Sequence, residues 1–314
     1  MTQNEIVVGL DDSPSGQAAL RWAADQAIRR QAVLRAIHVL DWPYGPRDTT
    51  FNAPRRNASR NFDEAQAAYL ADITKVFDDI APRPDWLVQF AKGEPGPVLV
   101  RESRDSQALV IGTREHVGLG RMLSGSISHY CISHASCPVV SVPTLVDAQP
   151  TEQLDQYASN GGSEIVVGVD LSRSARAALR WAAEQARATG QSLHAVHAVG
   201  TRALAVPVDP SEMDPSHRES IAAVFASIQP EPGWRLGFFS GEAGPVLAAI
   251  SQGAAMLVVG TKEHAGISRL VSGSVSHYCL GHAPAAVVTV PALAGQSSDQ
   301  DHDHAPVVDR PAAD

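Results

Sequence analysis

Two long stretches of this chain repeat each other. Ile-Val-Val-Gly-Leu-Asp at 6–11 returns as Ile-Val-Val-Gly-Val-Asp at 165–170, and residues 18–24 return unchanged at 177–183. The longest matches pair residues 110–116 with 258–264 and residues 123–131 with 271–279. A match over so much chain indicates a duplicated domain rather than a short solenoid unit. The duplication predicts two copies of one fold, and each copy can serve as a comparison for the other.

The length of 314 residues suits two domains that each bury a core. We predict a first domain over 1–143, a linker over 144–162, a second domain over 163–291 and a disordered tail over 292–314. The linker is polar and ends in Ser-Asn-Gly-Gly, and the tail is rich in Gly, Ser, Asp, His and Pro.

Composition narrows the class of protein. The formal net charge of −9 argues against a general nucleic-acid or membrane surface. No apolar run approaches the ~20 residues that span a bilayer, and the start lacks the pattern of a signal peptide. Three cysteines form no disulfide framework, and Cys131 and Cys279 stand at equivalent repeat positions as small apolar helix residues. We expect a soluble protein of the reducing cytoplasm.

Short apolar β-branched runs alternate with helical patterns in each repeat. Such alternation predicts an α/β fold with a parallel sheet covered on both faces. In the first repeat the expected strands are 5–10, 32–40, 85–91, 108–112 and 139–142. The first expected helix begins at Pro14, with Ser13 as its N-cap. The other expected helices cover 61–80, 97–104 and 124–134.

The repeats differ in length after the second strand. The span from His38 to Trp86 is eleven residues longer than that from His197 to Trp234. The excess lies around 42–60 and carries Arg47, Arg55, Arg56 and Arg60. Because loops at the carboxyl ends of strands border the ligand crevice of open α/β sheets, this insertion either covers a ligand in the first repeat or is a tolerated surface insertion.

The loop after the fourth strand has the pattern of an anion site. Gly112 ends the strand, and Ser124-Gly125-Ser126 opens a helix. Glycine lets a backbone come close, and free N–H groups at a helix start attract an anion. Alternatively, Ser124 acts only as an N-cap.

On these residues each repeat resembles the universal stress protein family. Nucleotide-binding members carry Gly, two residues, Gly, nine residues, Gly, then Ser or Thr, which Gly112 with Gly125-Ser126 and Gly260 with Gly273-Ser274 match in part. The opening Val-Val-Gly-Leu-Asp-Asp-Ser is also similar to that family's first strand. The resemblance implies two tandem Rossmann-like domains, each an open five-stranded parallel sheet with helices on both faces, that bind ATP or a related adenine nucleotide, with Mg²⁺ as a companion ion.

The resemblance also implies the binding residues. Asp11 and Asp170 would lie near ribose, phosphate or Mg²⁺, and Val39 and Ala198 would border the adenine. The phosphates would be held by Gly112, Gly125, Ser126 and Ile127 in the first repeat and by Gly260, Gly273, Ser274 and Val275 in the second. No protein-bound metal and no catalytic residue is expected.

One departure from the motif occurs in both repeats. Glu115 and Glu263 replace its second glycine. A carboxylate ~4 Å from a phosphate would repel it by ~4 kcal/mol at an effective dielectric of ~20. The glutamate either points to solvent, pairs with a neighbouring basic residue, or holds Mg²⁺. Arg121 and Arg269, three residues before each Ser-Gly-Ser, would meet a phosphate, meet this glutamate or stay exposed.

Two further motifs carry weaker chemistry. His129-Tyr130 and His277-Tyr278 lack an evident nucleophile or orienting carboxylate, which favours a packing or interface role over a general base. Asp301-His-Asp-His304 in the tail is a poor metal site. The last strand of each repeat pairs across a two-fold in the resembled family, which implies an intramolecular pseudo-dimer and allows a homodimer.

The sequence leaves three functions of this protein to be tested. The first is a stress-response protein that senses or buffers ATP, with weak ATPase activity at most. The second is a dimerisation scaffold of the same fold that binds no nucleotide, and the third is a slow adenine nucleotide hydrolase.

Overall fold

The computed structural model describes residues 4–40, 58–81, 83, 85–113, 126–144, 162–200, 206–261 and 274–292, with side chains from 67 and 127 onward in the second and fourth helices. The predicted linker, except its first and last residues, and nearly all of the tail lie outside these residues, as does most of the insertion after the second strand.

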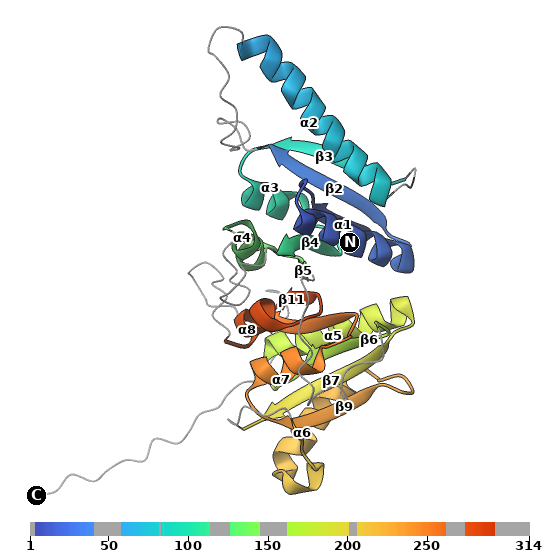
Figure 1. The fold of residues 1–314 in the computed structure, drawn as a ribbon. Coiled ribbons are helices and arrows are strands. Elements are labelled where there is room, and N and C mark those ends of the chain that lie inside the picture. The colour runs from blue at the N-terminus through green and yellow to red at the C-terminus, as the bar shows by residue number, and fades with distance from the viewer. Residues whose placement is uncertain are drawn as a thin grey trace, which may run out of the picture.

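The first repeat alternates strands and helices in the predicted order (Figure 1). Its elements are β1 (Glu5–Gly9), α1 (Pro14–Arg30), β2 (Val33–Leu40), α2 (Ala58–Ile80), β3 (Leu87–Lys92), α3 (Pro95–Glu102), β4 (Ala108–Thr113), α4 (Ser126–His134) and β5 (Val139–Pro143). Each predicted element is present, and most bounds differ by one to three residues.

The second repeat follows the same order with two additions. Its elements are β6 (Glu164–Gly168), α5 (Arg173–Thr189), β7 (Ser192–Val199), β8 (Val206–Pro207), a 3-10 turn (Pro210–Glu212), α6 (Pro215–Ala226), β9 (Arg235–Ser240), α7 (Ala243–Ile250), β10 (Met256–Thr261), α8 (Ser274–His282) and β11 (Val287–Pro291). The short strand β8, which lies antiparallel along β9, and the 3-10 turn were not predicted. A two-residue strand carries too little pattern to be read from sequence.

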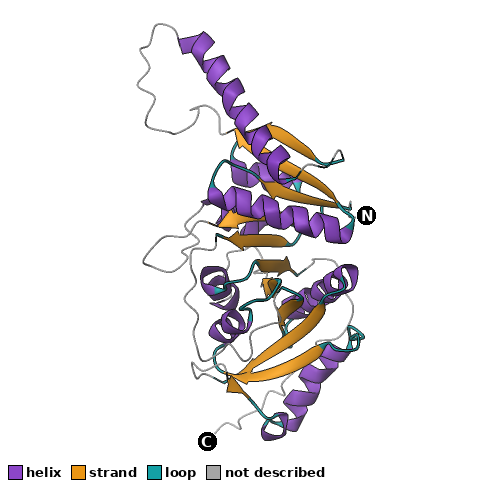
Figure 2. Ribbon diagram, turned by 45° about the vertical axis from the view of Figure 1, so that its right-hand side comes forward, coloured by secondary structure: helices purple, strands orange, loops and turns teal. Residues whose placement is uncertain are grey.

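The strands form one continuous sheet in the order β3-β2-β1-β4-β5-β11-β10-β6-β7-β9-β8 (Figure 2). Within each repeat the five main strands are parallel. In the first repeat the chain adds strands toward one edge of the sheet from β1 to β3 and toward the other edge from β4 to β5, so the strand order changes direction between β1 and β4. In the second repeat the same change falls between β6 and β10. The predicted fold class, two tandem Rossmann-like domains, is confirmed.

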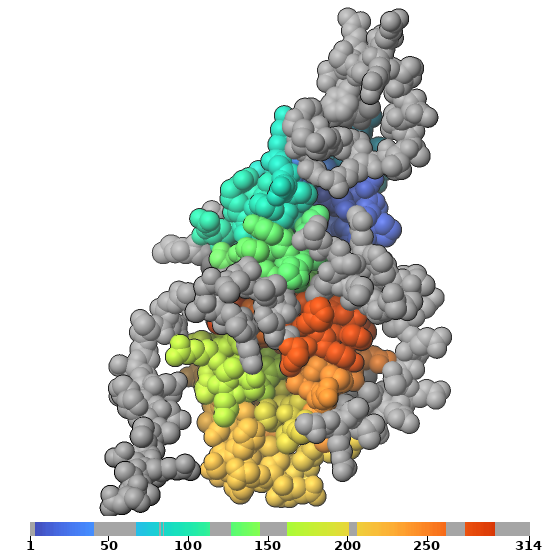
Figure 3. Space-filling view, turned by 90° about the vertical axis from the view of Figure 1, so that its left-hand side faces the viewer, coloured from blue at the N-terminus to red at the C-terminus, as the bar shows by residue number. Residues whose placement is uncertain are grey.

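Two apolar layers cover the two faces of the sheet. One packs α1, α2, α5 and α6 through residues such as Leu20, Ile73, Leu179 and Ile221. The other packs the remaining helices, through residues such as Leu99, Cys131, Leu247 and Cys279. Figure 3 views the side of the molecule that carries α3, α4, α7 and α8. All three cysteines are free and buried, as expected of apolar residues.

The first helix of each repeat begins with the predicted serine cap. Ser13 Oγ accepts a hydrogen bond from the Gly16 N–H at 3.0 Å, and Ser172 Oγ accepts from Ala175 N–H at 3.1 Å. Such caps satisfy one of the N–H groups left free at a helix start. They therefore fix where the loop after β1 and β6 ends, which is the loop that carries Asp11 and Asp170.

The two repeats meet through their last strands. Strand β5 pairs with β11 antiparallel, with Val140 opposite Val288, and Thr289 Oγ1 donates to the Val139 carbonyl at 3.2 Å. Beside this seam the Arg30 guanidinium of α1 lies 5.6 Å from the centre of the Trp181 ring of α5. Burial lowers the pKa of Arg30 to about 10. The repeats are thus joined by the backbone pairing of β5 with β11 and by the contact of Arg30 with Trp181.

Candidate functional site: the crevices at the carboxyl ends of the strands

The strand order places one candidate crevice in each repeat. Ligands of open α/β sheets bind outside the carboxyl ends of the strands, where the strand order reverses. Here that point lies between β1 and β4 and between β6 and β10. The loop after β1 carries Asp11, and β4 ends with Gly112 and Thr113. The fold therefore brings two of the predicted site segments together in each repeat.

Asp11 and Asp170 are held in the same way. The Ser13 N–H and hydroxyl both donate to Asp11 Oδ1, the N–H at 3.2 Å. The Ser172 N–H donates to Asp170 Oδ1 at 2.8 Å. Asp11 is half-buried and Asp170 is exposed. One carboxylate oxygen of each residue is thus used to order the turn before the helix.

Gly112 and Gly260 have a packing role that the sequence did not reveal. A Cβ at Gly112 would lie 2.3 Å from the Ser15 carbonyl oxygen, and one at Gly260 would lie 2.4 Å from the Ser174 carbonyl carbon and oxygen. The start of α1 or α5 therefore packs directly on the end of β4 or β10. This contact alone requires glycine, so the phosphate role of both glycines stays a prediction.

The helices after this loop begin close to the positions that the sequence predicts. Helix α4 begins at Ser126, two residues after its predicted start, and α8 begins at Ser274. In the first turns, Ile127 is 39% exposed, Val275 is half-buried and Ser274 is exposed. At least one side chain in the first turn of each helix is therefore exposed.

Part of the predicted site lies outside the described residues. This holds for Gly125, Gly273, Glu115, Glu263, Arg121 and Arg269, and for the arginines of the insertion up to Arg56; of Arg60 the structure describes only the backbone.

Val39 and Ala198 are half-buried at the carboxyl ends of β2 and β7, among residues packed toward α3 and α7. Their preceding histidines point to the opposite face. His38 Nδ1 lies 2.8 Å from the Leu10 carbonyl oxygen, and His197 Nδ1 lies 2.8 Å from that of Val169. Because a carbonyl only accepts, Nδ1 carries the hydrogen in both rings. Each histidine therefore ties its strand to the loop that bears Asp11 or Asp170.

A second residue packs on each of these histidines, and it differs between the repeats. Tyr69 of α2 lies 5.3 Å from the His38 ring, and His217 of α6 lies 5.1 Å from the His197 ring. Sequence reasoning missed this layer. The one hint of these histidine contacts in the sequence was that His38 and His197 directly precede the predicted adenine-bordering residues, Val39 and Ala198.

The tyrosines of the two His-Tyr motifs pack within their own repeats. The Tyr130 ring packs against Gly96 and stacks on His134 with ring centres 4.0 Å apart, and Tyr278 does the same with Gly244 and His282. This bears out a packing role for the two tyrosines. Among the described residues, no three His, Cys, Asp or Glu side chains converge to hold a metal ion. Asp301 to His304 lie outside them.

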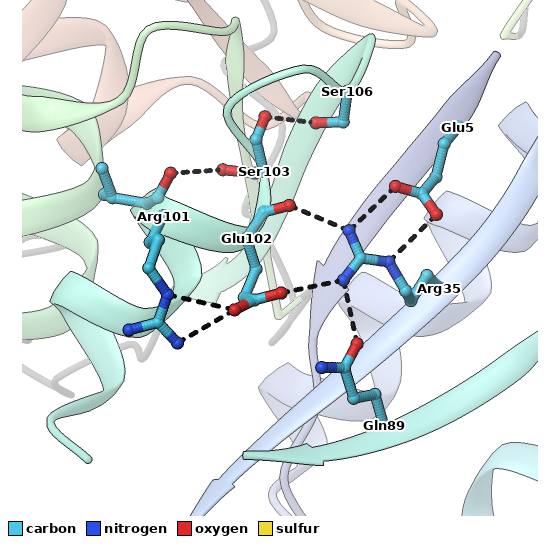
Figure 4. Close-up of polar contacts among 8 residues, drawn as sticks. Glu5, Arg35, Gln89, Arg101, Glu102, Ser103 and Ser106 are labelled. Carbon is cyan, nitrogen blue, oxygen red and sulfur yellow. Dashed lines mark hydrogen bonds and ion pairs between the residues drawn. The ribbon is translucent and has the colours of Figure 1, made fainter. Parts of the chain in front are cut away.

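A polar cluster lies at the amino ends of the strands in the first repeat, opposite the end of the sheet that carries the candidate crevice. Arg35 donates to Glu5 through Nε and Nη2, each at 2.9 Å, and to Gln89 Oε1 at 2.9 Å (Figure 4). Its Nη1 also donates to Glu102 Oε2 at 3.2 Å. Two carboxylates thus share one guanidinium, and Arg101 binds Glu102 from the solvent side. The cluster is saturated and offers nothing to a ligand.

The same place in the second repeat holds His194. It is buried beside Gly237, and its Nδ1 lies 3.8 Å from Glu164 Oε2. The Arg235 guanidinium donates to that same oxygen at 2.9 Å. Burial, with a smaller effect of Arg235, lowers the pKa of His194 to about 3. The second repeat therefore keeps a neutral imidazole where the first keeps a charged guanidinium.

This difference predicts acid sensitivity in the second repeat. Below the ordinary histidine pKa of about 6.5 the unfolded chain binds a proton at residue 194 that the folded chain does not, so stability falls as pH drops from about 6.5 toward 3. At pH 5 the loss is about 2 kcal/mol at 1.4 kcal/mol per pKa unit. His197, whose pKa is also lowered by burial, adds a loss of the same sign.

The measurement is urea unfolding at pH 7.5 and pH 5, with hydrogen exchange to assign the loss to a repeat. In His194→Leu the loss between the two pH values is expected to shrink by that amount. Replacing the exposed His277 by leucine is the control. An unchanged acid loss in His194→Leu would show that this imidazole is charged in the folded protein.

The fold and the crevices define a doubly wound α/β protein of two similar domains. A model of the universal stress protein family matches residues 3–143 and 163–291. The chain therefore belongs to the universal stress protein family.

Full-length relatives support this assignment. A universal stress protein of Mycolicibacterium smegmatis is 28% identical over 286 residues, which cover 88% of this chain and 92% of the relative. One of Mycobacterium tuberculosis strain H37Rv is 27% identical over 296 residues, covering 91% and 96%. The structure of a universal stress protein from Archaeoglobus fulgidus superposes with a TM-score of 0.63 at 16% identity, covering 93% of this chain and all of that one. This last likeness is one of fold.

None of the described helices combines the length and the apolar character that crossing a membrane requires.

Proposed function

We propose that this protein binds ATP or a related adenine nucleotide in one or both crevices and acts in the cytoplasm as a sensor or regulator in the response to stress. The observation that carries the proposal is the shared construction of the two crevices. In each, a carboxylate is oriented by the N–H of a capping serine, and the partial motif of nucleotide-binding members ends at the start of a helix, α4 or α8. The family supplies the class of ligand.

Each part of the crevice has a role in this proposal. The free oxygen of Asp170, on an exposed side chain, would accept a hydrogen bond from a ribose hydroxyl or hold an ion of a metal–nucleotide complex. The N–H groups at the start of α4 and α8 would donate to phosphate oxygens. Val39 and Ala198 would border the adenine. None of these residues is arranged as a nucleophile with a base, so hydrolysis would be slow at most.

Isothermal titration of the full chain with ATP and Mg²⁺ tests the proposal. We expect heat of binding and a rise in Tm, since a ligand at 100 times its Kd stabilises by about 2.7 kcal/mol. Ile127→Glu with Val275→Glu, which places a carboxylate at each helix start, is expected to weaken binding about tenfold or more.

Val33→Glu is the matched control, because Val33 is 37% exposed and begins β2 at the other end of the sheet. No heat and no thermal shift at millimolar ATP would contradict nucleotide binding.

A scaffold without nucleotide is the second candidate. It is favoured by the glutamates at the motif's second glycine and by the packing role of Gly112 and Gly260. It predicts that Glu115→Gly with Glu263→Gly creates ATP binding that the parent lacks. If the parent copurifies with ATP, this candidate fails.

We also propose that the β5–β11 pairing makes the chain a pseudo-dimer of its own two repeats. The antiparallel backbone pairing between the last strands supports it. Association of two chains would then need a surface other than these strand edges, and sedimentation of the purified chain measures it.

A further inference from the structure

Two histidines of the second repeat face each other through the same ring nitrogen. His197 lies near the end of β7 and His217 in the first turn of α6, and their Nε2 atoms are 3.0 Å apart. His197 is 7% exposed and His217 is half-buried, so the pair lies just below the surface. Imidazole nitrogens are the commonest protein ligands of divalent transition metals, and here two of them are within reach of one ion.

His197 is fixed in the way that metal-binding histidines usually are. Its Nδ1–H donates to the Val169 carbonyl at 2.8 Å, which leaves a lone pair on Nε2. A hydrogen bond of this kind sets the tautomer and the orientation of a ligating ring. The backbone of His217 is held as well, because its N–H donates at 3.0 Å to Asp214, the cap of α6. Both rings are thus positioned before a metal arrives.

The first repeat offers one imidazole at the equivalent place. His38 is held as His197 is, with Nδ1 at 2.8 Å from the Leu10 carbonyl oxygen. The ring that packs on it belongs to Tyr69, whose phenol carries no imidazole nitrogen. One fold therefore places a histidine–tyrosine pair in the first repeat and a histidine–histidine pair in the second, so each repeat is a natural control for the other.

We propose that His197 and His217 bind one divalent transition-metal ion through their Nε2 atoms, with Cu²⁺ held more tightly than Zn²⁺. Bonds of about 2.0 Å to nitrogens 3.0 Å apart give a nitrogen–metal–nitrogen angle of about 95°. This angle is close to the right angle of tetragonal Cu²⁺ sites and narrower than the tetrahedral angle of about 109° that Zn²⁺ adopts. Cu²⁺ also has the highest affinity of the divalent first-row metals for nitrogen ligands.

The surroundings of the pair suit an exchangeable cation. Without metal, the Nε2–H of His217 donates to His197; on binding, this hydrogen moves to Nδ1 of the same ring, so His217 stays neutral. Asp170 directly follows Val169, Asp214 caps the helix of His217, and both carboxylates are exposed, which favours positive charge at the pair. Within the described part of the chain no group of three His, Cys, Asp or Glu side chains converges, so water completes the coordination.

Titration of the full chain with Cu²⁺ at pH 7.5, followed by calorimetry and electron paramagnetic resonance, tests the proposal. In every protein tested, His302 and His304 of the tail are replaced by alanine, so that the tail supplies no imidazole. We expect one tight Cu²⁺ per chain, with hyperfine coupling to two nitrogen nuclei. Zn²⁺ is expected to bind more weakly in the same titration.

Exchanging the facing residue between the repeats moves the site. His217→Tyr gives the second repeat the residue of the first and is expected to weaken Cu²⁺ binding by about 10- to 100-fold or more, since even the loss of an outer partner of a metal-bound histidine costs that much. Tyr69→His places an imidazole against His38 and should add a second tight Cu²⁺. His277→Tyr is the matched control, because His277 is an exposed histidine of α8, and it should leave binding unchanged.

The outcomes decide the site without reference to nucleotide binding. Equal Cu²⁺ affinity of the parent and His217→Tyr, or a spectrum without coupling to two nitrogens, would overturn the proposal. If His217→Tyr does not fold, Tyr69→His still decides, because failure to gain a second Cu²⁺ would contradict binding by the facing pair. Tighter binding of Zn²⁺ than of Cu²⁺ would overturn the choice of metal that the angle gives.

Discussion

Replacing Gly112 by alanine is expected to destabilise the first repeat by about 3 kcal/mol. The added Cβ would lie 2.3 Å from the Ser15 carbonyl oxygen and 2.4 Å from its carbon, both of them backbone atoms. Neither can move without shifting the capped start of α1 or the end of β4. Urea unfolding, with hydrogen exchange to separate the repeats, measures the loss.

Two other glycines calibrate this prediction. Gly260→Ala should cause a similar loss in the second repeat, where the Cβ would meet Ser174 at 2.4 Å. Gly9→Ala should cost less, because its Cβ would lie 3.0 Å from Leu99 Cδ1, the tip of a side chain that can turn away. If Gly112→Ala unfolds like the parent but loses nucleotide binding, the glycine serves the ligand rather than the packing.

Arg35→Met is expected to destabilise the first repeat by about 3 kcal/mol or more, because it leaves the carboxylates of Glu5 and Glu102 without their shared cation. The side chains of Arg35, Glu5 and Glu102 are 16%, 14% and 22% exposed. Removing one partner of so enclosed a group costs more than the group contributes as a whole. Chemical unfolding at pH 7.5 gives the loss.

The triple variant Arg35→Met, Glu5→Gln, Glu102→Gln should recover much of that stability, because neither enclosed carboxylate is then left without a cation. Arg101 loses its partner Glu102, but its side chain is 61% exposed, so the loss is small. Arg29→Met is the control. Its partner Asp25 lies at 2.7 Å, but the two side chains are 45% and 53% exposed, and such pairs contribute at most about 0.5 kcal/mol. If Arg35→Met and Arg29→Met lose equal stability, the cluster is as weak as a surface pair.

The duplication made the sequence a reliable guide to the fold. Local signals fixed the starts of α1 and α5, since Ser13 and Ser172 are capping residues just before a helical pattern, and the structure has both caps. Continuous β-branched runs such as Ile6 to Val8 require cover on both faces, which only a layered α/β fold gives. The order of the strands in the sheet was not predicted, because no local pattern encodes it.

The candidate site was predicted less completely. Asp11, Gly112 and Ile127 were named from their places in a motif, and the fold brings their segments to one end of the sheet. The sequence could not show that Gly112 is required by the backbone of Ser15, because that contact joins residues almost a hundred positions apart. Nor could it show that Tyr69 and His217 occupy the same place, since the connections before them differ in length.

The sequence by itself determined that this protein has two α/β repeats of alternating strands and helices, because hydrophobic period, caps and repeated motifs are local properties. Only the tertiary structure decided which residues meet. It paired β5 with β11, placed His194 in the second repeat at the position that Arg35 holds in the first, and brought Tyr69 against His38 and His217 against His197. Charge and packing depend on distances in space, and distances between residues far apart in the chain exist only once it has folded.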